Sequence, residues 1–262
     1  MKIRQYQVDA FANKVFDGNP AAVCPLDAWL DDGLLQSIAT ENNLAETAFF
    51  VPSADEDGFY GLRWFTPVAE VDLCGHATLA SAHIIFEVLG HKGPAVTFAT
   101  RSGELSVKKK EDLLAMDFPA ANPVPCAPPA ALAQGLGISP SKVLSDYDYI
   151  AVFENEDDVK SISPDYGRLA ALDLRAVVAT APGLHYDFVS RVFAPKLGIP
   201  EDPVTGSAHC ELAPYWAARL GTDVLRARQV SRRGGDVHCE IRGRRVVLSG
   251  RAVTFMEADI FI

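Results

Sequence analysis

The chain has 262 residues, of which 48% are hydrophobic and 22% are charged, so it can bury a substantial core in one large domain or two small ones. Its formal charge of −10 disfavours a nucleic-acid partner, and no apolar run approaches the roughly 18 residues of a membrane-spanning helix. The first residues alternate like a strand, unlike a signal peptide, so we expect a cytoplasmic protein. The cysteines are odd in number and irregularly spaced, which indicates neither a disulfide framework nor a zinc finger (Cys24, Cys74, Cys126, Cys210 and Cys239).

The first half of the chain predicts a sheet with two helices. Apolar residues at helical spacing favour a helix over Trp29 to Asn42, and a nearly continuous apolar composition favours a buried helix over Gly75 to Val88. Alternating, β-branched or aromatic runs predict the strands, at Ile3 to Phe11, Ala21 to Pro25, Thr47 to Val51, Gly61 to Phe65, Ala95 to Thr100, Glu104 to Lys108 and Leu113 to Phe118.

A cluster of four prolines between Ala120 and Pro129 cannot continue a helix or a central strand, and we interpret it as a linker. The predicted lobes are therefore residues 1–121 and 127–262, with 251–262 as a candidate strand returning to the first lobe. The order of elements recurs after the linker. The predicted strands here are Tyr149 to Phe153, which an acidic turn follows, Arg175 to Thr180 and Tyr186 to Ala194. The predicted helices are Asp165 to Ala171 and Gly206 to Leu220.

One offset of 128 positions aligns parts of the two halves. It pairs Phe65 with Phe193, Pro67 with Pro195 and Cys74 with Asp202. Such a match indicates an internal duplication, which would make two similar lobes with the two turns at a shared cleft.

Two glycine-bearing turns open predicted helices, at Gly75-His76-Ala77 and at Thr205-Gly206-Ser207. The first N–H groups of a helix lack intrahelical partners, so such a turn can bind a carboxylate or phosphate. Either turn alone is more often just a tight connection between strand and helix. Their pairing favours an anion-binding function.

Four side chains could carry proton chemistry, and each has a structural alternative. Glu46 begins an otherwise apolar strand, where burial would raise its pKa, unless it is an exposed strand-start glutamate. His76 could polarise or protonate a substrate or could satisfy a carbonyl in its turn. Asp202 could hold the histidine or the substrate, or close an Asx turn. Cys74 could be a reactive thiolate before a helix or a buried apolar sulfur.

Cofactor and metal motifs are not found in the sequence. No glycine-rich dinucleotide or P-loop fingerprint occurs, and the nearest set of metal donors matches no familiar zinc spacing (Cys74, His76, His83, His209 and Cys210). We therefore predict neither a metal nor a cofactor.

Several motifs together resemble the PhzF-like phenazine-biosynthesis family. They occur in family order over nearly the whole chain: Asp9-Ala-Phe11, Gly18-Asn-Pro-Ala-Ala-Val23, Asn43-Leu-Ala-Glu-Thr47, Phe65-Thr-Pro67, Cys74-Gly-His-Ala-Thr78 and Glu201-Asp-Pro-Val-Thr-Gly-Ser-Ala208. The resemblance implies the α+β diaminopimelate-epimerase fold, with two pseudo-symmetric lobes, each a curled, mostly antiparallel sheet around a central helix. It also implies an active site in the cleft between the lobes, a homodimer, and catalysis without cofactor or metal.

The resemblance also implies roles for particular residues. Glu46 matches the glutamate that moves a proton between two carbons of a dihydro-hydroxyanthranilate, and His76 and Asp202 match its polar companions. Gly75, Gly206 and Ser207 match turns that hold the substrate carboxylate, and we also predict that Asn19 and Cys74 bind the substrate. Related racemases use one cysteine from each lobe, but Asp202 stands where the offset of 128 places the second, so a two-thiol racemase is not expected.

These observations favour a cofactor-independent isomerase that acts on a small carboxylate by proton transfer through Glu46. Two alternatives stay open at this point. One is an epimerase or racemase that uses Cys74 with an unlike partner, and the other is a non-catalytic protein that binds small carboxylates. A shared scaffold does not by itself establish phenazine synthesis.

Overall fold

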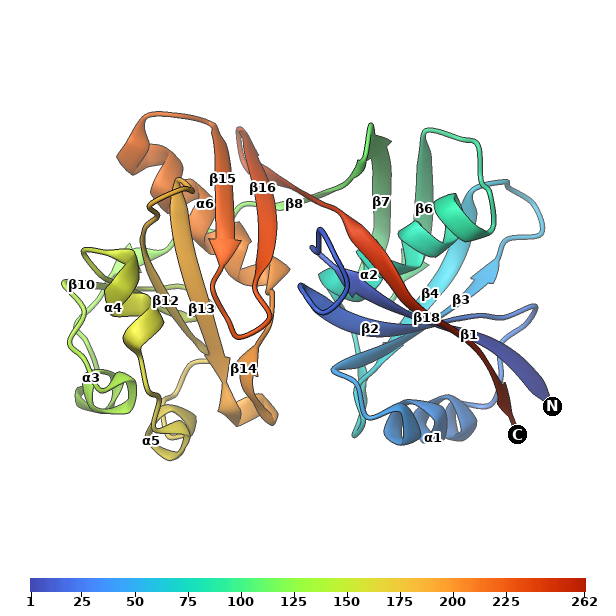
Figure 1. Ribbon diagram of the computed structural model, residues 1–262, viewed down its shortest axis with the longest axis horizontal. Helices are drawn as coiled ribbons and strands as arrows, with labels where there is room; N and C mark the ends of the chain where they lie inside the picture. The colour runs from blue at the N-terminus through green and yellow to red at the C-terminus, as the bar shows by residue number, and fades with distance from the viewer. The chain divides into compact units, whose positions relative to one another are not determined.

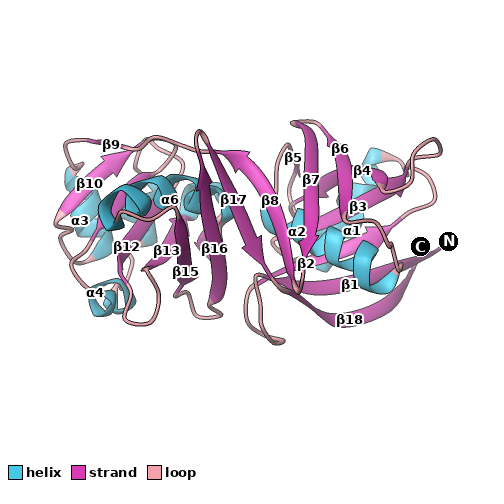
Figure 2. Cartoon of the chain, turned by 90° about the horizontal axis from the view of Figure 1, so that it is seen from above, coloured by secondary structure: helices cyan, strands magenta, loops and turns pink.

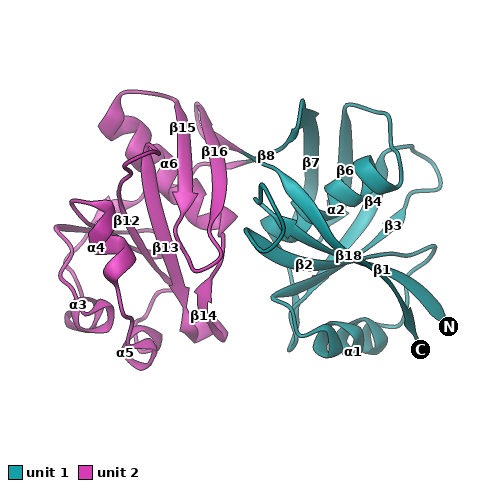
Figure 3. Ribbon diagram, in the orientation of Figure 1, with its two compact units in different colours: residues 1–117, 249–262 teal, residues 118–248 magenta.

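A computed structural model describes residues 1–262 (Figure 1). The chain divides into two compact units, coloured separately in Figure 3. Unit 1 consists of Met1–Asp117 and Ser249–Ile262, and unit 2 consists of Phe118–Leu248. None of the helices is long and apolar enough to cross a membrane.

Unit 1 holds one helix on the outside of its sheet and one that is buried. These are α1 (Asp32–Asn42) and α2 (Gly75–His83), and α2 continues into a π-helical turn, η1 (Ile84–Val88). The strands are β1 (Lys2–Ala10), β2 (Asn19–Pro25), β3 (Glu46–Pro52), β4 (Phe59–Phe65), β5 (Glu70–Val71), β6 (Ala95–Thr100), β7 (Gly103–Lys110), β8 (Leu113–Pro119) and β18 (Ala252–Phe261).

Unit 2 has the longest helix of the chain, α6 (Gly206–Leu220), and three short helices. The short helices are α3 (Ala130–Leu136), α4 (Glu156–Ser161) and α5 (Tyr166–Ala170), and a 3-10 turn, η2, spans Pro195–Leu197. The strands are β9 (Val124–Pro125), β10 (Lys142–Ser145), β11 (Tyr149–Val152), β12 (Val177–Pro182), β13 (Phe188–Ala194), β14 (Ile199–Asp202), β15 (Val224–Gln229), β16 (Gly235–Arg242) and β17 (Arg245–Gly250).

The two units pair their strands in the same directions. In unit 1, β1 is antiparallel to β2, β2 is parallel to β3, β3 is antiparallel to β4, β4 is parallel to β6, and β6 is antiparallel to β7. The series β10, β11, β12, β13, β15 and β16 repeats these five relations in unit 2. The repeated series of pairings supports the predicted duplication, and the curled, mostly antiparallel sheets confirm the predicted fold class.

Each unit packs a helix against its sheet. Helix α2 lies against β1, β2 and β3, and α6 lies against β15 and β16 (Figure 2). Seven of the nine residues of α2 are buried, and small side chains allow this close packing. The buried hydroxyls of Thr78 and Ser81 donate to the carbonyls of Cys74 and Ala77, four residues earlier, so burial leaves neither group without a partner.

Most predicted elements are confirmed, with differences at their ends. The first helix begins at Asp32 and not near Trp29, because the Asp31 carboxylate accepts the N–H of Gly33 and caps the helix there. The second predicted helix is α-helical only to His83. The prediction missed β10, β14 and the hairpin strands β15 to β17, and it treated α4 as an acidic turn.

The offset of 128 fails where the helices begin. Helix α2 begins at Gly75 and α6 at Gly206, so the two helix starts are 131 positions apart. The 3-10 turn η2 and the four-residue β14 lie before the second helix, where unit 1 has only the two-residue β5. Cys74 therefore corresponds to Thr205 and not to Asp202. Both residues are N-caps with extended backbone, and neither caps its helix through its side chain.

Candidate functional site

A buried carboxylate and a buried imidazole face each other in unit 1. Oε2 of Glu46 lies 3.1 Å from Nε2 of His76, and the two side chains are only 12% and 8% exposed. This contact lacks hydrogen-bond geometry, and neither atom has another hydrogen-bond partner. Attraction between opposite charges therefore dominates the contact, and both atoms keep the capacity to bond a further group.

Asn19 and Cys74 contact the opposite edge of the imidazole ring. The amide nitrogen of Asn19 is 3.3 Å from Nδ1 of His76, and Sγ of Cys74 is 3.5 Å from the same atom. The Asn19 amide can donate to Nδ1 only while that nitrogen carries no proton. The role of each group in this contact therefore depends on the protonation state of the ring, and Glu46 favours the protonated ring.

The fold brings these residues together from three separate segments. Asn19 begins β2 and Glu46 begins β3, and the two strands run parallel with Ala21 opposite Glu46. Because parallel neighbours start at the same edge of a sheet, both side chains reach the same end of it. Cys74, Gly75 and His76 form the start of α2, which packs against these strands. Five of the eight predicted site residues therefore share one location.

The charges of this cluster follow from burial and proximity. Burial alone would raise the pKa of Glu46, but the charge of His76 and the proximity of the His76 and Cys74 side chains outweigh it, so the pKa of Glu46 is lowered. Burial opposes a charge on His76, yet the neighbouring Cys74 and Glu46 raise its pKa well above 6.5. Burial and the Glu46 charge raise the pKa of the Cys74 thiol. The expected raised pKa of Glu46 is thus wrong, since that prediction had no partner for the carboxylate.

The same three residues form the one group of side chains that could hold a metal ion. Their donor atoms lie within 4.8 Å of one another, but the thiol contacts Nδ1 of His76 and the carboxylate contacts Nε2. An imidazole binds an ion through one nitrogen, and a thiol with a raised pKa is a poor ligand. The arrangement suits proton transfer better than metal binding.

In unit 2 the remaining predicted residues lie around the start of α6. Asp202 ends β14, and Gly206 and Ser207 begin the helix. The hydroxyl of Thr205 donates to the Asp202 carboxylate in a short bond. The Asp202 carboxylate thus accepts a bond that closes the turn, which agrees with the structural alternative for this residue. The expected facing of the two turns stays a prediction.

Buried Gln229 on β15 fixes the same turn with both ends of its amide. Its nitrogen donates to the carbonyl of Asp202 at 2.6 Å and to the hydroxyl of Thr205 at 3.2 Å, and its oxygen accepts the N–H of Thr205 at 3.0 Å. Sequence reasoning missed this residue. The available signal was a glutamine in register with Leu225 and Ala227 on the buried face of an alternating strand.

A second polar network lies beside Ser207. The guanidinium of Arg175 donates to both oxygens of Asp148, at 2.9 and 2.7 Å, and to Oγ of Ser207 at 3.0 Å. Asp148 and Glu211 are both fully buried. Burial, with the Asp148 charge next, raises the pKa of Glu211 to about 8. Nothing in the local sequence distinguishes these three residues, because their significance comes from partners that are distant in the chain.

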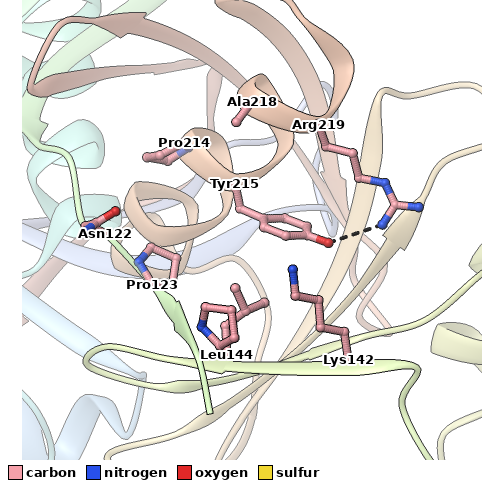
Figure 4. A pocket seen from close by; sticks show the side chains of 9 residues that line it. Asn122, Pro123, Lys142, Leu144, Pro214, Tyr215, Ala218 and Arg219 are labelled. Carbon is pink, nitrogen blue, oxygen red and sulfur yellow. Dashed lines mark hydrogen bonds between the residues drawn. The ribbon is translucent and has the colours of Figure 1, made fainter.

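An open cavity of about 540 Å³ lies elsewhere in unit 2 (Figure 4). Its lining includes Pro123, Lys142, Tyr215 and Arg219, and the Tyr215 hydroxyl accepts a bond from Arg219 at 3.2 Å. None of the predicted site residues lines it. The candidate site is therefore identified by its buried titratable groups and not by concave shape.

Comparison with known proteins assigns the family. Residues 8–258 match the family model described as phenazine biosynthesis-like protein. A curated relative from Pseudomonas aeruginosa, named an uncharacterized isomerase, is 54% identical over the full length of both chains. The crystal structure of a PhzF-family protein from Enterococcus faecalis matches with a TM-score of 0.97 at 45% identity, covering all of both chains.

A more distant structure shares the fold. A predicted epimerase from Pseudomonas aeruginosa matches with a TM-score of 0.76 at 20% identity, covering 99% of each chain, which shows a common fold alone. The chain therefore belongs to the phenazine biosynthesis-like family and is an isomerase of the PhzF type.

Proposed function

We propose that this isomerase acts without a cofactor on a small carboxylate, cyclic or acyclic, and that Glu46 moves a proton between two of its carbons. The observation that carries the proposal is the buried Glu46 carboxylate, whose Oε2 lies 3.1 Å from Nε2 of His76 and makes no hydrogen bond. A base must come within hydrogen-bond reach of the proton that it removes, and a carboxylate oxygen that makes no hydrogen bond can accept that proton.

The charge states favour Glu46 as the base. Its lowered pKa leaves it a carboxylate at neutral pH, and the raised pKa of His76 leaves that ring protonated. When negative charge develops on the substrate, the imidazolium stabilises it, and a buried cation does so more strongly than one in water. His76 thus lowers the energy of the intermediate and orients Glu46.

The proposed steps conserve atoms and electrons. The Glu46 carboxylate takes a proton from a carbon next to a carbonyl or double bond, and the electron pair of the broken C–H bond enters that conjugated system. The protonated Glu46 then gives the proton to a second carbon, which uses an electron pair from the same system. The product is an isomer of the substrate, and nothing is oxidised or reduced.

Unit 2 supplies the anion-binding part of the proposal. Gly206 and Ser207 begin α6, where backbone N–H groups have no intrahelical acceptor, and they would bind the substrate carboxylate. Asp202 would interact with a polar group of the substrate. Asn19, Cys74 and Gly75 would make the corresponding contacts from unit 1.

The structure gives no particular support to an epimerase that uses Cys74. The pKa of this thiol is raised, so it is not poised as a thiolate base. The residue at the corresponding N-cap of α6 is Thr205, which carries a hydroxyl in place of a thiol. A pair of sulfur acid–base groups is therefore not available at the two helix starts.

Solvent-deuterium incorporation tests the proposal. Purified protein is incubated in deuterated buffer with a panel of small carboxylates that includes dihydro-hydroxyanthranilate, and labelling is measured by mass spectrometry and NMR. Glu46→Gln should reduce labelling at carbon by about 100-fold or more, the usual contribution of a general base. Glu104→Gln, which changes an exposed glutamate of β7, should label like wild type.

Two outcomes would contradict this function. Full labelling by Glu46→Gln would show that another group moves the proton. Absence of labelling across the panel, in a protein that still binds carboxylates, would favour the binding-protein alternative.

A further inference from the structure

Arg175 and Ser207 lie beside the start of α6 and are both accessible to solvent. Ser207 is exposed, and the side chain of Arg175 is 40% exposed. Behind Arg175, Asp148 is fully buried and bonds both ends of the guanidinium fork. Such a bidentate pair fixes the plane of the guanidinium.

The bond from Arg175 determines what Ser207 can do. A guanidinium has only donors, so the serine oxygen must be the acceptor of the 3.0 Å bond. The hydroxyl proton of Ser207 then remains available for donation to another group. A hydroxyl without this contact would rotate freely between donor and acceptor roles.

The acids behind Arg175 are themselves held in place. The backbone N–H of Asp148 donates to Oε1 of Glu211 at 3.3 Å. Glu211 lies in the first half of α6, one turn after Ser207. The bonds to Asp148 raise the pKa of Arg175, although burial acts in the opposite direction. The network thus connects Ser207, one of the three predicted site residues of unit 2, to the buried Asp148 through one arginine.

We propose that Arg175, held by Asp148, is a positioning residue that directs the Ser207 hydroxyl toward the carboxylate of the substrate. This inference rests on the proposed function, in which Ser207 binds that carboxylate. A purely structural role, in which Arg175 only neutralises Asp148, makes different predictions. It would lower stability on substitution but leave the affinity of the folded protein for anions unchanged.

A double-mutant cycle separates the two roles. Benzoate is titrated into the full chain at neutral pH, and affinity is measured from the backbone amide signal of Ser207 by nitrogen-15 NMR. Benzamide, the uncharged analogue, serves as the probe for recognition without charge. We expect Ser207→Ala and Arg175→Met each to weaken benzoate binding by about tenfold, the effect of one charge-assisted hydrogen bond. The double variant should be no weaker than Ser207→Ala alone, since Arg175 acts through Ser207.

Matched variants control for charge and hydroxyl. Arg168→Met removes an exposed arginine of α5 from the same unit and should bind benzoate like wild type. Ser207→Thr keeps the hydroxyl and should retain most of the affinity. Arg175→Met could fail to fold, because it leaves Asp148 unpaired. The variant that combines Arg175→Met with Asp148→Asn removes both charges and then takes the place of Arg175→Met in the cycle.

Several results would overturn the inference. One is that wild type binds benzoate no more tightly than benzamide, and another is that Arg175→Met leaves the affinity for benzoate unchanged. A third is that the two losses add in the double variant, which would show that Arg175 acts independently of Ser207. The proposed function is tested separately, because Glu46→Gln should lose labelling yet bind benzoate normally. Labelling that survives in Arg175→Met with unchanged benzoate affinity would reject this inference and leave the proton-transfer function standing.

Discussion

Glu46 and His76 keep each other charged inside unit 1. The pKa of the carboxyl group is lowered and that of the imidazole is raised, although burial acts in the opposite direction on both. A group such as His76, whose pKa is higher in the folded than in the unfolded state, stabilises the fold at pH values below its unfolded-state pKa. This contribution is lost as the pH rises through the folded-state pKa. A carboxyl group such as Glu46, whose pKa is lower in the folded state, stabilises the fold at pH values above its unfolded-state pKa. That contribution is lost as the pH falls through the folded-state pKa. The pair should therefore stabilise the protein most between about pH 4.5 and 6.5, the reference values of the two groups.

His76→Gln tests this ion pair. Removing one partner of a buried pair costs about 3–5 kcal/mol, because the other charge stays buried and unpaired. The drop in Tm relative to wild type should be largest near pH 4.5 to 6.5 and smaller at alkaline pH, where the wild-type ring is also neutral. Thermal unfolding across pH 4 to 9 measures it. An equal drop at all pH values would argue against the ion pair, and exposed His185→Gln should show no drop.

The turn before α6 depends on a single side chain from another element. Gln229 satisfies the carbonyl of Asp202, the N–H of Thr205 and the Thr205 hydroxyl. Its side chain is fully buried, so water cannot replace these bonds without a cavity opening. The geometry of Asp202, Gly206 and Ser207 therefore depends on β15, which follows them in the chain.

Gln229→Ala should lower the free energy of unfolding by about 2–4 kcal/mol, since it leaves buried backbone groups of this turn unsatisfied. Gln229→Glu keeps an acceptor for the Thr205 N–H but places a buried carboxylate against the Asp202 carbonyl, so its loss should be at least as large. Urea denaturation gives the free energies. Exposed Gln134→Ala, in α3 of the same unit, should change stability by less than about 0.5 kcal/mol. Equal stability of Gln229→Ala and wild type would show that the turn holds itself.

The last strand of the chain completes unit 1. Residues of β18 pair with β1 from Lys2 opposite Phe261 to Ala10 opposite Ala252, with a bulge after Gln7. Phe255 lies at this bulge, and its ring centroid is 5.6 Å from that of Phe16. Strand β1 thus has a neighbour on each side, β2 and β18, and neither edge of β1 is left open.

A chain ending at Arg251 would lack β18 and expose one edge of β1. We expect a lower Tm for unit 1 and concentration-dependent aggregation, because an open strand edge pairs with other chains. Calorimetry and light scattering measure the two effects. Phe261→Ala, which truncates a side chain that is 78% exposed but keeps the ladder, should behave like wild type. Unchanged Tm and solubility of the shortened chain would show that β18 contributes little.

The order of elements and half of the site could be read from local patterns. Alternation, helical spacing and apolar composition depend on neighbouring residues, so they located α1, α2 and most strands of unit 1. The Glu46, His76 and Cys74 motifs were also visible, because family motifs are short and contiguous. The same logic failed for the repeat offset, since one strand match at Phe65 and Phe193 says nothing of how many residues follow before the next helix. The expected homodimer stays a prediction.

What the sequence determined by itself was the family, the fold class and the residue types gathered at two helix starts. Only the tertiary structure decided the charges and partners of those residues. The sequence predicted a raised pKa for Glu46 from burial, but the imidazole at 3.1 Å reverses the direction. Gln229 and Arg175 had no local signal strong enough to be selected, because each acts on a turn or a serine more than 20 residues away. Electrostatic and hydrogen-bond effects depend on distance in space, which the spacing of residues along a chain does not give.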